Sequence, residues 1–220
     1  MSYKNKNVMA IGAHPDDVEF GCSGTLCNHI DSGDNVVMVV MTNTESVDGV
    51  TGEIIRTREE NQEEAICASN VIGCDIEFLP FKDLHVPFSF ESVSKLEKLM
   101  IDYDIDTVYT HWGGDTNQDH IATLETTMAS ARLLSNVLCY EQLPVPRITN
   151  VYPTANYYVD VTDVFDKKIE MCECHDSQLK KYKKQGYDIL DGLSVLARYR
   201  GNQIGVEYAE AFDVLKMVKS

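Results

Sequence analysis

Short apolar segments of strand length alternate with longer segments of helical periodicity along most of this 220-residue chain. The clearest strand is residues 35–41 (NVVMVVM), a run rich in β-branched residues, and residues 7–13 (NVMAIGA) form another. Strands that are apolar almost throughout are typical of parallel sheets whose two faces are both covered by helices. The alternation therefore predicts an α/β fold with a doubly wound, mostly parallel sheet and helices on both faces.

A single domain over residues 1–220 is expected, because no linker or internal repeat interrupts this pattern. Segment 42–52 is expected to be a loop, and segment 143–153 a long loop or a β-excursion within the domain. Ligands of such sheets bind beyond the carboxyl ends of the strands, so the residues that follow the strands are the candidate site. The other expected strands are 75–79, 107–110, 137–140 and 157–161, and the expected helices are 22–32, 55–72, 92–103, 119–134, 162–184 and 189–200.

The charge of the chain limits its partners. Asp and Glu number 35 and Lys and Arg number 19, so the formal net charge is −16. A surface of this sign repels phosphate backbones and anionic membranes, which argues against a nucleic-acid partner. No apolar run is long enough for a signal peptide or a membrane span, so a cytoplasmic location is expected.

The cysteines agree with that location. They are odd in number, scattered and without a CxxC pair, which is typical of reduced, buried thiols in a cytoplasmic protein. Cys172 and Cys174 are two residues apart, so a helix would direct them to different faces and they are not expected to share a metal. The cysteines are Cys22, Cys27, Cys67, Cys74, Cys139, Cys172 and Cys174.

A dense polar cluster follows the first strand. His14, Asp16 and Asp17 lie within four residues of one another. Imidazole nitrogen and carboxylate oxygen are ligands of zinc-type ions, and a tight turn can direct His14 and Asp17 to the same point. Asp16 then projects differently and is free to act on a water molecule. The alternative is that the aspartates only cap the following helix and His14 is an ordinary loop residue.

A second cluster follows the fourth strand, at the same expected edge of the sheet. It contains two histidines, His111 and His120, and the aspartates Asp115 and Asp119. A catalytic zinc takes three protein ligands and keeps one position open. His14, Asp17 and one of these two histidines would complete such a set. Asp119 can orient the imidazole of His120 by accepting its other N–H, or it can cap the helix, or do both.

These two segments resemble the signatures of a known family. Residues 13–17 (AHPDD), and Asp115-x-Asn117-x-Asp119-His120, are similar to the AHPDD and D-x-H-x-D-H segments of the LmbE-like, or PIG-L, zinc-dependent N-acetylglucosaminyl deacetylases. Shorter segments that resemble this family in the same order are 57–60 (TREE), 174–178 (CHDSQ) and 208–212 (YAEAF).

The resemblance implies a Rossmann-like fold and one bound Zn²⁺ per chain, with Fe²⁺ or Co²⁺ as other metals that the ligand types accept. His14, Asp17 and His120 would bind the metal, and Asp16 would be the general base. The implied enzyme is a hydrolase that removes the N-acetyl group from an N-acetylglucosamine-type sugar conjugate by means of a zinc-activated water. A small amino-sugar substrate and a homo-oligomer are the expected partners.

One position departs from the family pattern. Many members have a histidine where this chain has Asn117, which can donate a hydrogen bond to an oxyanion but cannot carry a proton. His175 or Asp16 is then expected to protonate the leaving amine, with His111, otherwise a packed or solvent-facing histidine, as a further alternative. Arg58 is expected to contact the substrate or to pair with neighbouring glutamates. Arg147 and the basic run 180–184 are either substrate contacts or solvated surface.

Two other functions remain open from the sequence. The chain can be an amidase of another N-acyl compound or thiol conjugate, or a non-catalytic metal-binding module. The number of protein ligands distinguishes an enzyme from a non-catalytic metal-binding module, because a fourth ligand such as His111 would occupy the coordination position that catalysis needs.

Overall fold

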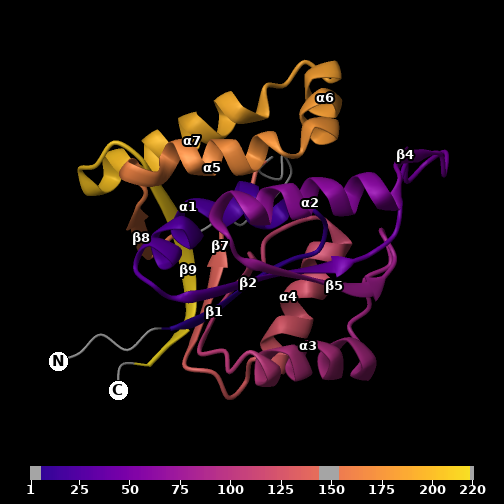
Figure 1. Cartoon of the computed structure of the whole chain (residues 1–220), viewed down its shortest axis with the longest axis horizontal. Helices are drawn as coiled ribbons and strands as arrows, with labels where there is room; N and C mark the ends of the chain where they lie inside the picture. Colours follow the sequence, from indigo (N-terminus) through magenta and orange to yellow (C-terminus); the bar gives the residue numbers. More distant parts are fainter. Residues whose placement is uncertain (1–5, 144–153, 219–220) are drawn as a thin grey trace.

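Seven strands form the central sheet of the computed structural model, which describes residues 6–143 and 154–218 (Figure 1). Its strands are β1 (Asn7–Gly12), β2 (Asn35–Thr42), β5 (Asp75–Phe81), β6 (Thr107–His111), β7 (Asn136–Tyr140), β8 (Tyr157–Asp160) and β9 (Ala209–Met217). Their order is β5-β2-β1-β6-β7-β9-β8. The first five are parallel, and β9 runs antiparallel to both β7 and β8. The predicted doubly wound, mostly parallel sheet is therefore confirmed.

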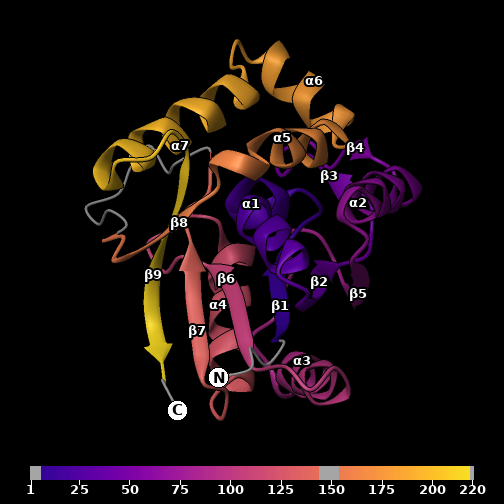
Figure 2. The same cartoon turned by 60° about the vertical axis from the view of Figure 1, so that its left-hand side comes forward.

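Helices cover both faces of this sheet (Figure 2). They are α1 (Asp17–Asp31), α2 (Arg58–Ile72), α3 (Phe90–Asp102), α4 (Gln118–Ser130), the 3₁₀ turn η1 (Thr162–Val164), α5 (Phe165–Glu173), α6 (Asp176–Lys184) and α7 (Ile189–Ile204). The alternating side chains of β1 show why two layers are needed. Val8 and Ala10 pack in one core with α1, α2 and α5, whereas Met9 and Ile11 pack in the other with α3. No helix in the described part of the chain is long and apolar enough to cross a membrane.

Several element boundaries differ from the prediction. Helix α1 begins at Asp17 rather than at residue 22, because its first turns are buried on all sides and show no one-sided apolar periodicity. Residues 54–56 are a strand, not helix, and α2 begins after the Thr57 cap, whose side chain accepts from the Glu60 N–H.

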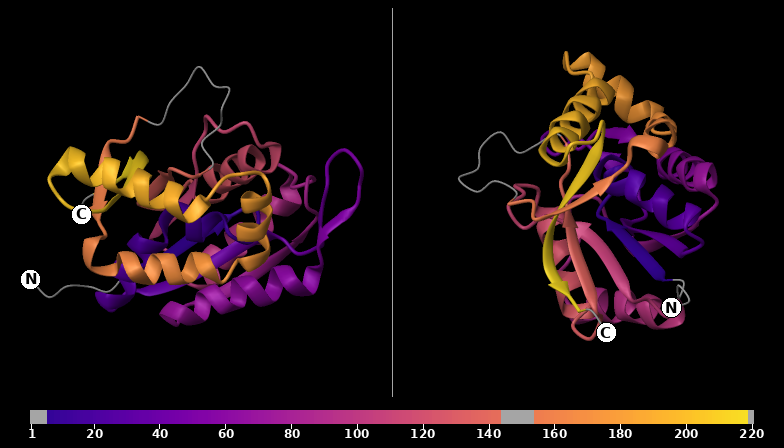
Figure 3. Two further views of the ribbon diagram at one scale, coloured as in Figure 1. Left: turned by 90° about the horizontal axis from the view of Figure 1, so that it is seen from above. Right: turned by 90° about the vertical axis from the view of Figure 1, so that its left-hand side faces the viewer.

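The segment predicted as the loop 42–52 contains half of a hairpin. Strands β3 (Ser46–Val47) and β4 (Ile54–Arg56) pair antiparallel and project from the body of the protein (Figure 3). The expected helix 162–184 is instead η1, α5 and α6, with a break at Cys174–His175. Strand β9 was not indicated by the sequence, since a register shift interrupts its apolar alternation. The predicted loop 143–153 lies almost wholly outside the described residues.

The expectation that all cysteines are reduced is wrong for one pair. Cys67 of α2 and Cys174, which follows α5, form a disulfide with their Cα atoms 5.8 Å apart. The two residues meet because α2 packs against α5, although 107 positions separate them in the chain. The other five cysteines are free thiols, and Cys22, Cys27, Cys139 and Cys172 are buried as expected.

Candidate active site

The candidate site lies where the chain reverses its direction of strand addition. From β1 the chain adds β2 and β5 on one side, and then β6 and β7 on the other side. The crevice beyond the carboxyl ends at such a switch point is the usual ligand position in open α/β sheets. His14 and Asp17 follow β1, and His120 follows β6, so both predicted clusters face this crevice.

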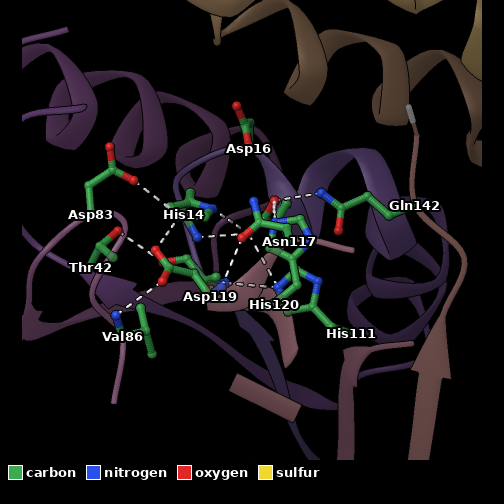
Figure 4. Close-up of polar contacts among 12 residues, drawn as sticks. His14, Asp16, Thr42, Asp83, Val86, His111, Asn117, Asp119, His120 and Gln142 are labelled. Atoms are coloured by element: carbon green, nitrogen blue, oxygen red, sulfur yellow. Dashed lines mark hydrogen bonds and ion pairs between the residues drawn. The ribbon is translucent and has the colours of Figure 1, made fainter. Parts of the chain in front are cut away.

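Three of the predicted ligands converge there. Ligand atoms of His14, Asp17 and His120 lie within 4.8 Å of one another. His14 and His120 lie near each other in Figure 4. One Asp17 oxygen is 3.5 Å from Nδ1 of His14, and the other is 3.4 Å from Nε2 of His120. Two imidazole nitrogens and a carboxylate oxygen at this spacing fit a zinc-type ion and leave a position for water or substrate. A tight turn makes the arrangement possible, because the His14 backbone N–H donates to Asp17 at 2.7 Å.

Different carboxylates orient the two imidazoles. Asp115 accepts from Nδ1 of His120 at 2.7 Å, while Asp119 lies 3.0 Å from Nε2 of His14. The prediction that Asp119 orients His120 is therefore wrong, since the Asp119 side chain points back across the crevice to the β1 cluster. A carboxylate on the outer nitrogen fixes the tautomer of a ligating imidazole and raises its basicity. Asp83, which follows β5, adds a second oxygen 3.2 Å from Nε2 of His14.

His111 packs against the His14, Asp17 and His120 group but does not line the cavity. It is fully buried, and its Nε2 accepts the Ala13 backbone N–H at 2.9 Å. Burial and the neighbouring His120 lower the pKa of His111 to about 4, so the ring is neutral. Its ring stacks on His120 with centroids 4.0 Å apart. The arrangement favours His120 over His111 as the third ligand.

Asp16 occupies a constrained backbone position. It holds the N-cap position of α1 without a side-chain capping hydrogen bond, at φ 104°, a left-handed conformation that a residue other than glycine seldom adopts. Only 4% of Asp16 is exposed, and its carboxylate points away from His14 in Figure 4. The Gln178 side-chain amide donates to it, and an Arg56 nitrogen lies 3.8 Å away. Strained backbone of this kind persists where a side chain must be aimed.

Burial is the main influence on the Asp16 carboxyl, and it raises the pKa above the ordinary value. The negative charge of Asp17 acts in the same direction, whereas Arg56, His175 and the Gln178 hydrogen bond oppose it. A carboxylate with a raised pKa is a better proton acceptor than an exposed one.

The cation near this carboxylate is Arg56 rather than the predicted Arg58. Arg58 is exposed, and its Nε donates to Asn43 at 3.2 Å. Arg56 in β4 is only 4% exposed, lines the cavity and lies between Asp16 and Glu64. Arg56 takes the place predicted for Arg58 because β4 directs the Arg56 side chain inward, whereas the first turn of α2 directs Arg58 to solvent.

We expect Arg56→Met to lower kcat/KM by at least about tenfold, because Asp16 loses the cation that favours its charged form. The matched variant Arg58→Met should remain within about twofold of wild type, since Arg58 is exposed and its hydrogen bond goes to Asn43 rather than to Asp16. Amide hydrolysis measured on both purified variants checks this, and the opposite ranking would return the role to Arg58.

Two further predicted residues have positions that limit their roles. His175 is fully buried, its Nε2 lies 2.9 Å from Glu19, and it is not in the lining of the cavity. The expectation that His175 protonates the leaving amine is therefore not supported. Asn117 does line the cavity, and its Oδ1 caps α4 by accepting the Asp119 N–H at 2.9 Å. That hydrogen bond leaves the amide NH₂ as the end that can donate to a substrate.

These side chains line a cavity of about 520 Å³. The sheet edge supplies its floor, the β3–β4 hairpin supplies one wall, and α6 with the segment after it supplies another. Lys181 of the basic run lines the cavity, whereas Lys180, Lys183 and Lys184 are exposed. Arg147 lies outside the described residues.

Four cavity residues that contact His14, Asp16 or Asp17 were not among the predicted site residues. The rule that located the other clusters also applies to Asp83, which follows β5. Gln178 belongs to the CHDSQ segment, and its signal was the resemblance of that segment to the family. Gln142, which donates to Asp17, and Arg56 carry no pattern that marks them as site residues.

Two known deacetylases are similar to this chain in sequence. The chain is 34% identical to the uncharacterized deacetylase YaiS of Escherichia coli (strain K12) over 145 residues, 63% of this chain and 75% of the relative. It is 26% identical to the diacetylchitobiose deacetylase of Thermococcus kodakarensis over 223 residues, 93% of this chain and 81% of the relative.

A solved structure of a protein with another activity shares this fold. The 4-carboxy-2-hydroxymuconate hydratase of Pseudomonas putida KT2440 superposes with a TM-score of 0.82 at 18% identity, covering 98% of each chain. At this identity the likeness concerns the fold alone. The family follows from sequence: the family model of PIG-L, described as GlcNAc-PI de-N-acetylase, matches residues 9–131, more than half of the chain. The chain therefore belongs to the PIG-L family of deacetylases.

Proposed function

We propose that this protein is a metal-dependent N-deacetylase of an N-acetylglucosamine-type sugar conjugate. The observation that carries the proposal is the convergence of His14, Asp17 and His120 in a cavity that Asp16 also lines. The family description and the diacetylchitobiose deacetylase relative support an N-acetylated amino sugar as the substrate. The hydratase fold match does not favour a second function, because it rests on the fold alone.

The donor set fits a divalent cation, as two imidazoles and a carboxylate with their own hydrogen-bond partners are a usual zinc site. Such an ion, when bound, supplies Lewis-acid polarisation of the acyl carbonyl and acidifies a water molecule. The ligand types do not distinguish zinc from iron or cobalt.

The residues around the cation site divide the remaining work. Asp16 takes the proton of the attacking water and returns it to the leaving nitrogen, so one group acts as base and then as acid. Gln178 and Arg56 hold its carboxylate. Asn117 donates from its amide to the developing oxyanion. Asp119 and Asp115 keep His14 and His120 in the orientation that ligation requires.

Amine release from a panel of N-acetylglucosamine conjugates tests the proposal. Protein loaded with Zn²⁺, Fe²⁺ or Co²⁺ should release free amine, and a chelator should abolish the release until metal is restored. The metal content of the purified protein should approach one ion per chain. Absence of chelator-sensitive release across the panel with metal-loaded protein would refute the proposed activity.

The Gln178 hydrogen bond gives a pH signature. It lowers the pKa of Asp16, so Gln178→Met should raise that pKa. Because the base acts in its charged form, the acidic limb of the kcat/KM profile should move to higher pH in this variant. Gln185→Met, seven residues further on at the C-cap of α6, should leave the limb in place. A limb that stays fixed in Gln178→Met would show that Gln178 does not act through Asp16.

A further inference from the structure

A disulfide joins α2 to the junction between α5 and α6. Cys67 lies in α2, and Cys174 lies between the last residue of α5 and His175, which precedes α6. Neither cysteine lines the cavity. Cys67 is exposed and Cys174 is half-buried, so a small thiol in solution can reach the bond. Exposed disulfides are the ones that thiol–disulfide exchange opens most readily.

This junction carries the contact that holds the carboxylate of Asp16. Gln178 donates to Asp16 and lies in the first turn of α6, only four residues after Cys174. His175, at the N-cap of α6, makes no side-chain capping hydrogen bond, so the start of this helix depends on other segments of the chain. A movement of Cys174 is therefore passed to Gln178 over about one helical turn.

Two side chains of α2, one turn apart, hold the junction in place. Glu64 accepts from the Ser177 backbone N–H at 2.8 Å and from the Ser177 hydroxyl at 2.7 Å, which caps the start of α6. Cys67 follows Glu64 by three residues on the same side of α2 and supplies the covalent bond. A reductant leaves the Glu64 hydrogen bonds intact, as well as the buried contact of His175 with Glu19. Reduction should therefore loosen the junction without unfolding it.

We propose that the Cys67–Cys174 disulfide is a redox-sensitive clasp that keeps Gln178 against Asp16, and that its reduction lowers turnover. The effect on turnover rests on the proposed function. Once the clasp opens, the start of α6 is free to move and the Gln178 amide no longer fixes the Asp16 carboxylate. A misplacement of about 1 Å near the reacting groups costs up to about 10²-fold in rate.

A small dithiol supplies the two electrons that open the clasp. Its thiolate attacks one cysteine sulfur, and the other cysteine leaves as a thiolate. The second thiol of the reductant then displaces the first cysteine sulfur from the mixed disulfide. The two protons of the dithiol pass to the cysteine sulfurs, so the products are two cysteine thiols and a cyclic disulfide of the reductant.

Hydrogen exchange followed by mass spectrometry tests the clasp without any need for catalysis. The metal-free wild type, Cys67→Ser and Cys74→Ser would be compared before and after treatment with a water-soluble phosphine, chosen because the thiolates of a dithiol bind zinc. Cys74→Ser is the matched control, since Cys74 is a free, half-buried cysteine two residues after α2. Thiol titration of the denatured wild type should give five free thiols before reduction and seven after it.

Reduction of the wild type and of Cys74→Ser should speed amide exchange in residues 175–185 by at least about fivefold, and should lower kcat of the metal-loaded protein by a similar factor. Cys67→Ser should show both changes without a reductant and respond no further. Exchange in α4 should stay the same in every form, because the fold is retained. In Gln178→Met the reductant should leave kcat almost unchanged, since the contact that it weakens is already lost.

Seven free thiols before reduction, or equal exchange in residues 175–185 of the oxidised and reduced wild type, would overturn the inference. So would a kcat that reduction leaves unchanged in the wild type, or lowers equally in the wild type and in Gln178→Met. Faster exchange on reduction with no amine release from any form overturns the proposed activity, while the redox-dependent hold on α6 stands.

Discussion

Asp16→Asn should lower kcat by a factor of at least about 10² while the protein keeps its full metal content. Asparagine has almost the shape of aspartate, but its amide cannot accept the proton of the attacking water. The three metal-binding groups are untouched, and each keeps its own hydrogen-bond partner. Steady-state kinetics and metal analysis on the same preparation measure both quantities.

The backbone of Asp16 determines which substitution is informative. At φ 104°, asparagine is among the residues that enter the left-handed region most readily, whereas alanine or leucine adds strain at the start of α1. A loss of activity in Asp16→Ala would therefore mix lost chemistry with a displaced helix. Asp16→Asn separates the two effects.

Asp31→Asn is the matched control for Asp16→Asn. Asp31 lies at the opposite end of the same helix, where it pairs with Lys167 at the surface, and it undergoes the same change of charge. This variant should keep wild-type kcat. Turnover by metal-loaded Asp16→Asn within a few-fold of wild type would remove Asp16 from the role of general base.

The central strands and the position of the site could be predicted because both depend on local patterns. An apolar run such as residues 35–41 can bury all of its side chains only inside a sheet that is covered on both faces. The carboxyl ends of neighbouring parallel strands meet at one edge, so clusters about 100 residues apart were expected to converge. The structure brings His14, Asp17 and His120 within reach of one ion at that edge.

The contacts that tune the site could not be predicted from local patterns. Gln178 reaches Asp16 across 162 positions of the chain, through a break between α5 and α6 that the helical periodicity of 162–184 conceals. Arg56 and Arg58 are both arginines, two positions apart, so the sequence does not distinguish them. Only the pairing of β4 with β3 turns the Arg56 side chain inward. Asp119 was assigned to its sequence neighbour His120, whereas tertiary packing places it against His14.

His120→Ala should lose the metal, and with it all chelator-sensitive activity. His120 supplies one of the three ligand atoms, and its removal leaves only one imidazole and one carboxylate of that group. The loss of affinity should exceed that of Asp115→Asn, where only the orienting carboxylate changes and a reduction of about 10- to 100-fold is expected. Metal titration with a competing chelator orders the two variants, and the exposed His85 provides the control variant His85→Ala.

The pH dependence of metal binding gives a second measure of the same ligand. Burial by itself lowers the pKa of His120, but Asp17 and the Asp115 hydrogen bond raise it to about 9 in the metal-free protein. A metal ion must therefore displace a proton from His120 below pH 9, and affinity should rise by up to tenfold per pH unit for that proton. His120→Ala should lose this contribution. If the variant instead held stoichiometric metal, the ligand would be His111, whose ring stacks on His120 and whose Nε2 lies 3.2 Å from Asp17.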